Sequence, residues 1–240
     1  MTQSGTFFGG KFDRTEKQVT LPSGRSIVLM EMTGADESAL TKLARKNFAE
    51  GMNKFLVRVC KDLDGKPGAC QPEQFEGMLS GDRSALLLHL RVLTHGEKFE
   101  YKFTCDCEEK TDFEIDVADM IAKIKPYPNG DKRDFQIDID GHPLCFSLPD
   151  GRVEKKIAND DEVDVNKRIK AMKFWEPLQS GDTPVSAEHL RARHLARVRE
   201  ELKKLEFEVD STVSCKCPAC GRTKVAEVSG DPNFLFPGLV

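Results

Sequence analysis

Two cysteine clusters that lie far apart in the sequence constrain this chain more than any other feature. Cys105-Asp-Cys107 comes first, and Cys215-Lys-Cys217-Pro-Ala-Cys220-Gly221 follows much later. Zinc prefers four thiolate or imidazole ligands in a tetrahedron. A Cys-x-x-Cys-Gly turn suits such a site, because its backbone amides point at the sulfurs and Gly allows the final positive φ. The second cluster is therefore a specific signal, and the shorter Cys-x-Cys spacing of the first is a weaker one.

The cellular compartment decides how these cysteines are interpreted. The chain has 240 residues and eight cysteines, and it does not begin with a basic region followed by an apolar stretch, so we expect no signal peptide. In a reducing cytosol, close cysteine pairs bind metal more often than they form disulfides. We therefore predict one structural Zn²⁺ ion with Cys105, Cys107, Cys217 and Cys220 as ligands, and Cys215 as a substitute for Cys217. The alternative is a reduced or disulfide-linked cluster without metal.

The other three cysteines, Cys60, Cys70 and Cys145, have no close partners in the sequence. We expect a buried, reduced thiol at each of these positions, because free cysteine behaves as a small apolar residue. A Cys60–Cys70 bridge across the intervening Gly-Pro loop is a second interpretation, if the mature protein lies in an oxidising medium.

No sequence pattern indicates catalysis. Four sulfur ligands leave no open position for water on a zinc ion. The chain has no Gly-rich phosphate loop, no Gly-x-Ser-x-Gly and no His-Glu-x-x-His. Its formal net charge of −4 creates no general attraction for nucleic acid or an acidic membrane, and no apolar run approaches the length of a membrane span. We therefore predict a protein that is not an enzyme.

Apolar periodicity predicts several helices. The strongest signal covers residues 82–95, with Ser80 or Asp82 as the cap and Gly96 as the end. Leucines wrap more than half of this helix, so we expect it to be central and buried on nearly all sides. A second helix begins at Asp36 and ends near Gly51, and further helical segments are predicted at about 161–175 and 186–205. Residues 52–60 are too short a run to assign, and residues 62–70 are predicted as a loop.

Strand pairs are predicted around short turns. One lies in residues 18–30 and another in residues 131–148, around Asp140-Gly141. Two more hairpins carry the cysteines at their tips: residues 98–104 with 111–117, and residues 207–213 with 223–228. We therefore predict an α+β fold, with a helical core, short β-hairpins and a zinc-ribbon-like cluster formed by two distant cysteine hairpins.

These elements predict a division of the chain into domains. Residues 1–17 form an N-terminal arm, 18–97 a strand pair plus helical core, 98–117 and 206–229 a split zinc ribbon, 118–205 an inserted region, and 230–240 an aromatic tail. The motif Leu21-Pro-Ser-Gly24 recurs as Leu148-Pro-Asp-Gly151. An internal duplication is one explanation of the recurrence, and a common turn motif is the other.

Both ends of the chain carry aromatic and apolar side chains in segments too short to hold a helix or strand alone: Phe7, Phe8, Phe12, Phe234, Phe236 and Leu239. These side chains either pack onto the protein's own core or act as anchors that become ordered on a neighbouring protein. We favour anchors, because aromatic side chains are frequent interface hot spots.

The order of the motifs resembles a known family. The helix Asp82-x-x-x-Ala-Leu-Leu-Leu, the hairpin Phe103-Thr-Cys-Asp-Cys107, the late Cys-Pro-x-Cys-Gly and the end Asp231-Pro-Asn-Phe-Leu-Phe236 are similar to those of baseplate hub subunit and tail-assembly proteins of contractile-tailed (myovirus-type) bacteriophages. This chain has Cys-x-Cys where Cys-x-x-Cys is more usual. The resemblance implies a structural or assembly role in the hub or wedge of the virion's tail baseplate. It also implies synthesis in the host cytoplasm and other phage tail proteins as partners in a symmetric assembly.

The rival function is a zinc-ribbon protein that binds nucleic acid or regulates transcription. The basic residues of the helix at 189–204 could meet phosphates. Interspersed Glu188, Glu200 and Glu201 favour a solvated face instead, and the overall acidity opposes nucleic-acid binding. We therefore expect protein partners, with neither nucleic acid nor a membrane among them.

Overall fold

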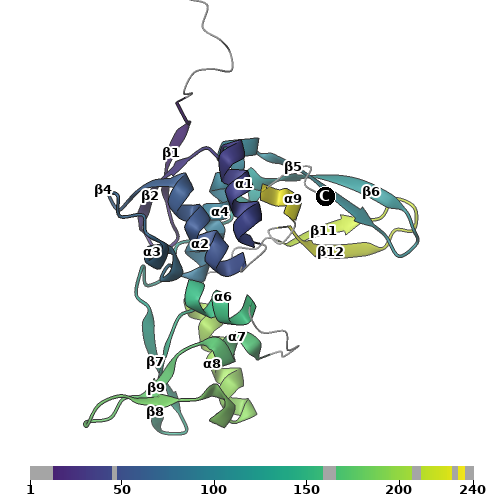
Figure 1. The fold of residues 1–240 in the computed structure, drawn as a ribbon. Helices are drawn as coiled ribbons and strands as arrows, with labels where there is room; N and C mark the ends of the chain where they lie inside the picture. The colour runs from purple at the N-terminus through teal and green to yellow at the C-terminus, as the bar shows by residue number, and fades with distance from the viewer. Residues whose placement is uncertain (1–12, 45–47, 159–165, 207–211, 229–231, 236–240) are drawn as a thin grey trace, which may run out of the picture.

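A computed structural model of the chain describes residues 13–44, 48–158, 166–206, 212–228 and 232–235. The fold is α+β, with helices and several small antiparallel sheets, as the sequence predicted. Figure 1 shows an upper lobe (residues 13–44, 48–97, 117–122 and 232–235), a lower lobe (residues 134–158 and 166–206) and an arm that projects from the upper lobe. The arm contains the hairpins β5 (Lys98–Thr104)–β6 (Lys110–Asp116) and β11 (Thr212–Lys216)–β12 (Thr223–Glu227).

The sheet of the upper lobe is an antiparallel meander. Its strands lie in the order β1 (Glu16–Thr20), β2 (Ser26–Met30), β3 (Cys60–Leu63) and β4 (Lys66–Pro67). The prediction of a loop at residues 62–70 was wrong, because β3 and β4 form a tight hairpin there. Asp64 and Gly65 adopt φ angles of 55° and 71° at its turn, a conformation that an Asp-Gly pair tolerates well.

The helix predicted to end near Gly51 does not end there. Helix α1 covers Gly34–Ala44, and α2 covers Phe48–Val59, so that Gly51 lies inside α2. The unassigned residues 52–59 belong to α2, whose buried side includes Phe55 and Leu56, each at most 1% exposed. This burial outweighs the cost of a glycine inside a helix, which is about 1 kcal/mol.

Helix α4 (Ser80–His95) is the central element of the upper lobe and follows the short α3 (Pro72–Glu76). As predicted, it is buried on most of its sides and ends at Gly96, whose φ is 81°. The predicted cap was wrong, because the N-cap is Leu79 and no side chain caps the helix. Asp82 instead accepts a hydrogen bond from the Ser23 amide (2.9 Å), which ties α4 to the β1–β2 turn.

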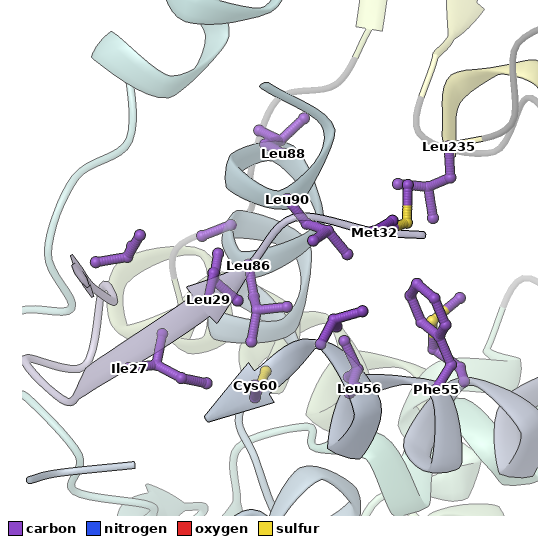
Figure 2. Close-up of a cluster of buried hydrophobic side chains, with 14 of the residues drawn as sticks. Ile27, Leu29, Met32, Phe55, Leu56, Cys60, Leu86, Leu88, Leu90 and Leu235 are labelled. Carbon is purple, nitrogen blue, oxygen red and sulfur yellow. The ribbon is translucent and has the colours of Figure 1, made fainter. Parts of the chain in front are cut away.

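Leucines of α4 form the centre of the main hydrophobic core. Figure 2 shows Leu86, Leu88 and Leu90 together with side chains of β2 and α2. On its other side α4 is covered by α5 (Val117–Ala122), by Phe99 of β5 and by the last helix, α9 (Pro232–Leu235). Strand β1 begins at Glu16, and α5 packs with this core through Val117 and Met120.

The lower lobe has a second antiparallel meander, in the order β7 (Asp134–Ile139), β8 (His142–Ser147), β9 (Phe174–Glu176) and β10 (Thr183–Val185). Its helices are α6 (Gly151–Ala158), α7 (Lys167–Ala171), the 3₁₀ helix η1 (Ala187–His189) and α8 (Ala192–Leu205). The helix predicted at 161–175 is thus only α7 in the described residues, and β9 replaces its end. The helix predicted at 186–205 is split, because Ser186 caps η1 and the chain is extended at Leu190 and Arg191 before α8.

The two Leu-Pro-x-Gly motifs have different structures. The first forms the β1–β2 turn, in which Gly24 has a φ of 87°. The second leads from β8 into α6, where the Asp150 side chain accepts a hydrogen bond from the Arg152 amide (2.9 Å). The lobes nevertheless share one order of elements: two strands, two helices, two strands, a short helix and a long helix. A duplication would therefore pair α4 with α8, rather than one motif with the other.

A buried arginine joins the two lobes. The Arg83 guanidinium donates to Asn53 Oδ1 (2.8 Å) and to the Phe75 carbonyl (2.7 Å) in the upper lobe, and to Glu154 Oε2 (2.7 Å) on α6. Gly151 lies against the same junction, where a Cβ atom would approach the Glu76 carbonyl to 2.9 Å. The junction therefore has no room for a side chain at residue 151.

The C-terminal aromatic residues divide into two groups. Phe234 is 1% exposed and packs edge-on against Phe99, with 5.4 Å between the ring centroids. The favoured interpretation, an anchor that awaits a partner, was wrong for Phe234, because it belongs to the core. Phe7, Phe8, Phe12, Phe236 and Leu239 lie outside the described residues. Within the described residues, no helix combines the length and the apolar character that a membrane crossing requires.

Candidate metal centre

The first cysteine pair lies in the tight turn between β5 and β6. The Cys105 amide donates to the Glu109 carbonyl and the Glu108 amide donates to the Cys105 carbonyl, both at 2.8 Å. Glu108 adopts a φ of 68°, which lets the chain reverse within the turn. The turn places the thiols of Cys105 and Cys107 at the tip of the arm.

The second pair lies in the turn between β11 and β12. The Cys217 amide donates to the Arg222 carbonyl (2.8 Å), and the Gly221 amide donates to the Cys217 carbonyl (2.9 Å). Gly221 has a φ of 72°, the left-handed conformation expected for the residue after a Cys-x-x-Cys pair. The Cys-x-x-Cys-Gly pattern predicted this positive φ at Gly221.

The two turns meet at the tip, where the arm's hairpins run side by side (Figure 1). Cys105 Sγ lies 3.6 Å from Cys220 Sγ, and Cys107 Sγ lies 3.7 Å from Cys217 Sγ. All four sulfurs lie within 4.8 Å of one another. A disulfide bond is about 2.05 Å long, so neither Cys105–Cys220 nor Cys107–Cys217 is a disulfide. The structure therefore brings together the four thiols that the sequence singled out.

The separations can be compared with those of a metal site. For a metal–sulfur bond of about 2.3 Å, the edge of a tetrahedron of sulfurs is about 3.8 Å. The Cys105–Cys220 and Cys107–Cys217 sulfur separations of 3.6 Å and 3.7 Å match this edge. The other sulfur–sulfur distances are at most 4.8 Å, and a small rotation of the side chains would shorten them to the edge length. The four residues therefore fit one tetrahedral ion such as zinc.

Hydrogen bonds lower the pKa of one of the four thiols, that of Cys217. Backbone hydrogen bonds from the amides of Cys220 and Ala219 lower the pKa of Cys217 to about 7. The pKa of Cys107 rises to about 12: a backbone hydrogen bond from Glu109 lowers it, but hydrogen bonds with the Cys220, Cys105 and Cys217 thiols and partial loss of hydration together raise it more. Four thiols this close cannot all lose their protons alone, and a divalent cation is the species that would replace those protons.

Burial differs among the four residues. Cys105 and Cys217 are buried at 8% and 1% exposure, whereas Cys107 and Cys220 are exposed. Cys215 is also buried, but it lies outside the group of four, on β11 opposite Lys224. Burial raises the pKa of Cys215. In this structure Cys215 is part of the packing beneath the site.

A small aromatic core supports the site from below. Phe103 stacks on Phe113 with 5.3 Å between centroids, and Lys224 of the other hairpin lies 5.5 Å above the Phe103 ring. Arg222 also reaches Asp106 across the two turns (3.7 Å). These contacts could not be predicted from the sequence, because no spacing signals a contact between residues so far apart in the chain.

The remaining cysteines are free in the structure. Cys60, Cys70 and Cys145 are each buried, and no disulfide joins Cys60 to Cys70. Burial, and to a lesser degree the neighbouring Cys70, raises the pKa of Cys60 well above its usual value. These residues have the character of packed, un-ionised thiols.

One comparison with known proteins returned a match. The model of a family described as T4 bacteriophage base plate protein matches residues 14–236, which include both lobes and the arm. No match was found among the curated proteins or among the solved structures.

Proposed function

The chain belongs to the T4 bacteriophage base plate protein family, and from this membership we propose that it is a non-catalytic structural or assembly component of a contractile-tail baseplate, stabilised by one structural zinc ion. The match over residues 14–236 carries the proposal, because it spans nearly the whole chain rather than a single motif. The place of action that follows is the tail of the virion, and the partners are other phage tail proteins in a symmetric assembly.

The structural role of the metal is supported by its ligands. Four thiolates would fill the coordination of zinc and leave no position for a substrate or a catalytic water. Two of the ligands come from one hairpin and two from the other, and 110 positions separate Cys107 from Cys217 in the sequence. The ion would therefore join two parts of the chain that share only a small apolar core, a task that suits a structural site.

Metal analysis of the purified full-length protein tests the zinc proposal. We expect about one equivalent of zinc per chain, since one tetrahedral site is present. Iron in place of zinc would change the identity of the ion and give a coloured protein, because tetrathiolate sites accept both metals. A folded protein that contains no metal would contradict the proposal.

Location of the protein tests the baseplate role. Tails purified from phage should contain the chain, and phage that lack its gene should build no complete tails until the gene is supplied again. A chain that is absent from tails and from their assembly intermediates would contradict the role. Salt-dependent binding of duplex DNA by the purified protein would instead favour the zinc-ribbon regulator.

A further inference from the structure

Helices α4 and α8 have the same position in the order of elements of their lobes, but different elements pack against them. Helix α4 contacts α5 and α9, and its leucines belong to the main core together with side chains of β2 and α2. On α8, Val198 and Leu202 pack into the core of the lower lobe, whereas side chains on the opposite side are exposed and no described element covers them. Figure 1 shows α8 at the outside of the lower lobe. The exposed side, called here the outer face of α8, consists of Arg193, Ala196, Arg197, Glu200, Lys203 and Lys204.

The outer face is basic. It carries four cationic side chains and one anionic one, Glu200. Arg193 pairs with Asp140 (2.5 Å) and Lys204 pairs with Glu201 (2.7 Å). Arg197 and Lys203 have no hydrogen bond or ion pair with the described part of the chain. These two cations flank the single anion Glu200, so the middle of this face carries a net positive charge.

Unpaired arginines are concentrated at this place. In the described ranges, the arginines outside α8 and its cap each bond to a carboxylate, a carbonyl or an amide oxygen. Arg193 and Arg199 on α8 also have partners. The exceptions are Arg197 and Arg191, which is the N-cap residue of the same helix. Arginine is the residue best suited to bind carboxylates at an interface, because its guanidinium can donate two hydrogen bonds to one carboxylate.

The chemistry of the face selects the class of partner. A nucleic-acid surface uses basic side chains with aromatic rings for stacking, and the outer face has none. Glu200 at its centre would also repel phosphates. We propose that the outer face of α8 binds a patch of Asp and Glu side chains on a neighbouring protein of the tail, an inference that rests on the proposed baseplate function.

Charge reversal on the full-length, zinc-loaded chain tests this surface. The double variant Arg197→Glu/Lys203→Glu is compared with Lys123→Glu/Lys125→Glu, which makes an equal charge change at two exposed positions just after α5. Incorporation into tails is measured in phage that lack the wild-type gene. We expect it to fall at least about tenfold for the first variant, because like charges opposed across an interface are strongly unfavourable, and to stay near wild type for the second.

Carbodiimide coupling of purified wild-type tails identifies the neighbour. This reagent joins an amine to a carboxylate in direct contact, so we expect an amide bond between Lys203 Nζ and an Asp or Glu of another protein. Coupling of Lys203 only to carboxylates of its own chain would overturn the proposal. So would normal incorporation of Arg197→Glu/Lys203→Glu, which would show a solvated face.

Two further outcomes remain decisive. If the Glu variant does not fold, the neutral variant Arg197→Gln/Lys203→Gln must still lower incorporation, or the proposal is wrong. Duplex DNA binding that the wild type shows and this variant loses would assign the face to nucleic acid. Absence of the wild-type chain from tails contradicts the baseplate function itself, whereas normal incorporation of both double variants contradicts only the role of α8.

Discussion

The thiols at the tip of the arm are unequal in their access to solvent. Cys105 and Cys217 lie inside the arm, while Cys107 and Cys220 face outward. An ion bound by all four would be approached from the side of the exposed pair, because the aromatic core closes the other side. Substitution of Cys107 or Cys220 therefore tests whether a metal is bound, with little disturbance of the packing inside the arm.

Cys220→Ser should remove the metal and destabilise the chain. Structural zinc binding is coupled to folding, so we expect the free energy of unfolding to fall by several kcal/mol, as measured by denaturant titration with metal analysis. Cys145→Ser is the matched control, because Cys145 is a buried free thiol outside the cluster. A Cys220→Ser protein with a full complement of zinc and unchanged stability would show that Cys220 is not a ligand.

His89 on α4 should make the protein sensitive to acid. Burial, with a smaller effect of Lys17, lowers the pKa of His89 to about 4, compared with about 6.5 in an unfolded chain. The unfolded state therefore binds more protons between pH 6.5 and 4, and stability should decrease as the pH falls through this window.

Thermal unfolding between pH 7 and 4 measures this effect. His89→Gln should show a shallower loss of Tm on acidification than the wild type. His189→Gln serves as the control, because His189 is exposed on η1. An equally steep loss in His89→Gln would assign the acid sensitivity to other groups, among them His95, whose pKa burial also lowers.

At the scale of elements, local signals were sufficient where chain geometry alone sets the structure. Gly96 ends α4 and Asp140-Gly141 turns β7 into β8, because each needs a positive φ that few residues adopt easily. Gly221 and the cysteine turns were predicted on the same grounds. These turns placed the candidate site at the tips of two hairpins.

Local signals failed where tertiary packing decides. Gly51 was predicted to end a helix, but the burial of Phe55 and Leu56 continues it. Phe234 was assigned to a free tail, since nothing in its own segment reveals that Phe99 lies beside it. Each error concerns a contact between residues distant in the sequence.

Helix α9 should contribute to stability through Phe234. Phe234→Ala removes a side chain that is 1% exposed, so we expect a loss of about 3–5 kcal/mol in the free energy of unfolding. A double-mutant cycle with Phe99→Ala should give a coupling of about 0.5–1.5 kcal/mol for the edge-on ring pair. Val225→Ala is the control, because Val225 is 64% exposed. Unchanged stability in Phe234→Ala would show that α9 does not pack on the core in solution.

At the scale of the whole molecule, each lobe has a large hydrophobic core, whereas the arm has only a small one. Among the described residues, the buried members of the arm's cluster are Phe103, Cys105, Cys215 and Cys217. The lobes are further fixed to each other by Arg83 and its three acceptors. Stability is therefore unevenly distributed, and the arm should be the part most dependent on metal.

Removal of the metal by a chelator should open the arm and leave the lobes folded. Hydrogen exchange should accelerate in residues 98–116 and 212–228, while the amides of α4 stay protected. Restored protection after zinc is added back would show that the change is reversible. Equal acceleration in α4 would contradict this prediction, because it would mean that the metal supports the whole fold.

The path of the chain through the arm also determines where a mechanical load would go. The lower lobe lies on the stretch of chain between Cys107 and Cys217, and both ends of that stretch lie in the cysteine cluster. With an ion in place, tension along the backbone from β5 to β12 would cross the arm through metal–sulfur bonds and bypass the lower lobe. The lower lobe would stay out of the line of force while a tail contracts. Only after the metal–sulfur bonds break would force act on the lower lobe. The stretch between Cys107 and Cys217 could then extend to roughly 360 Å.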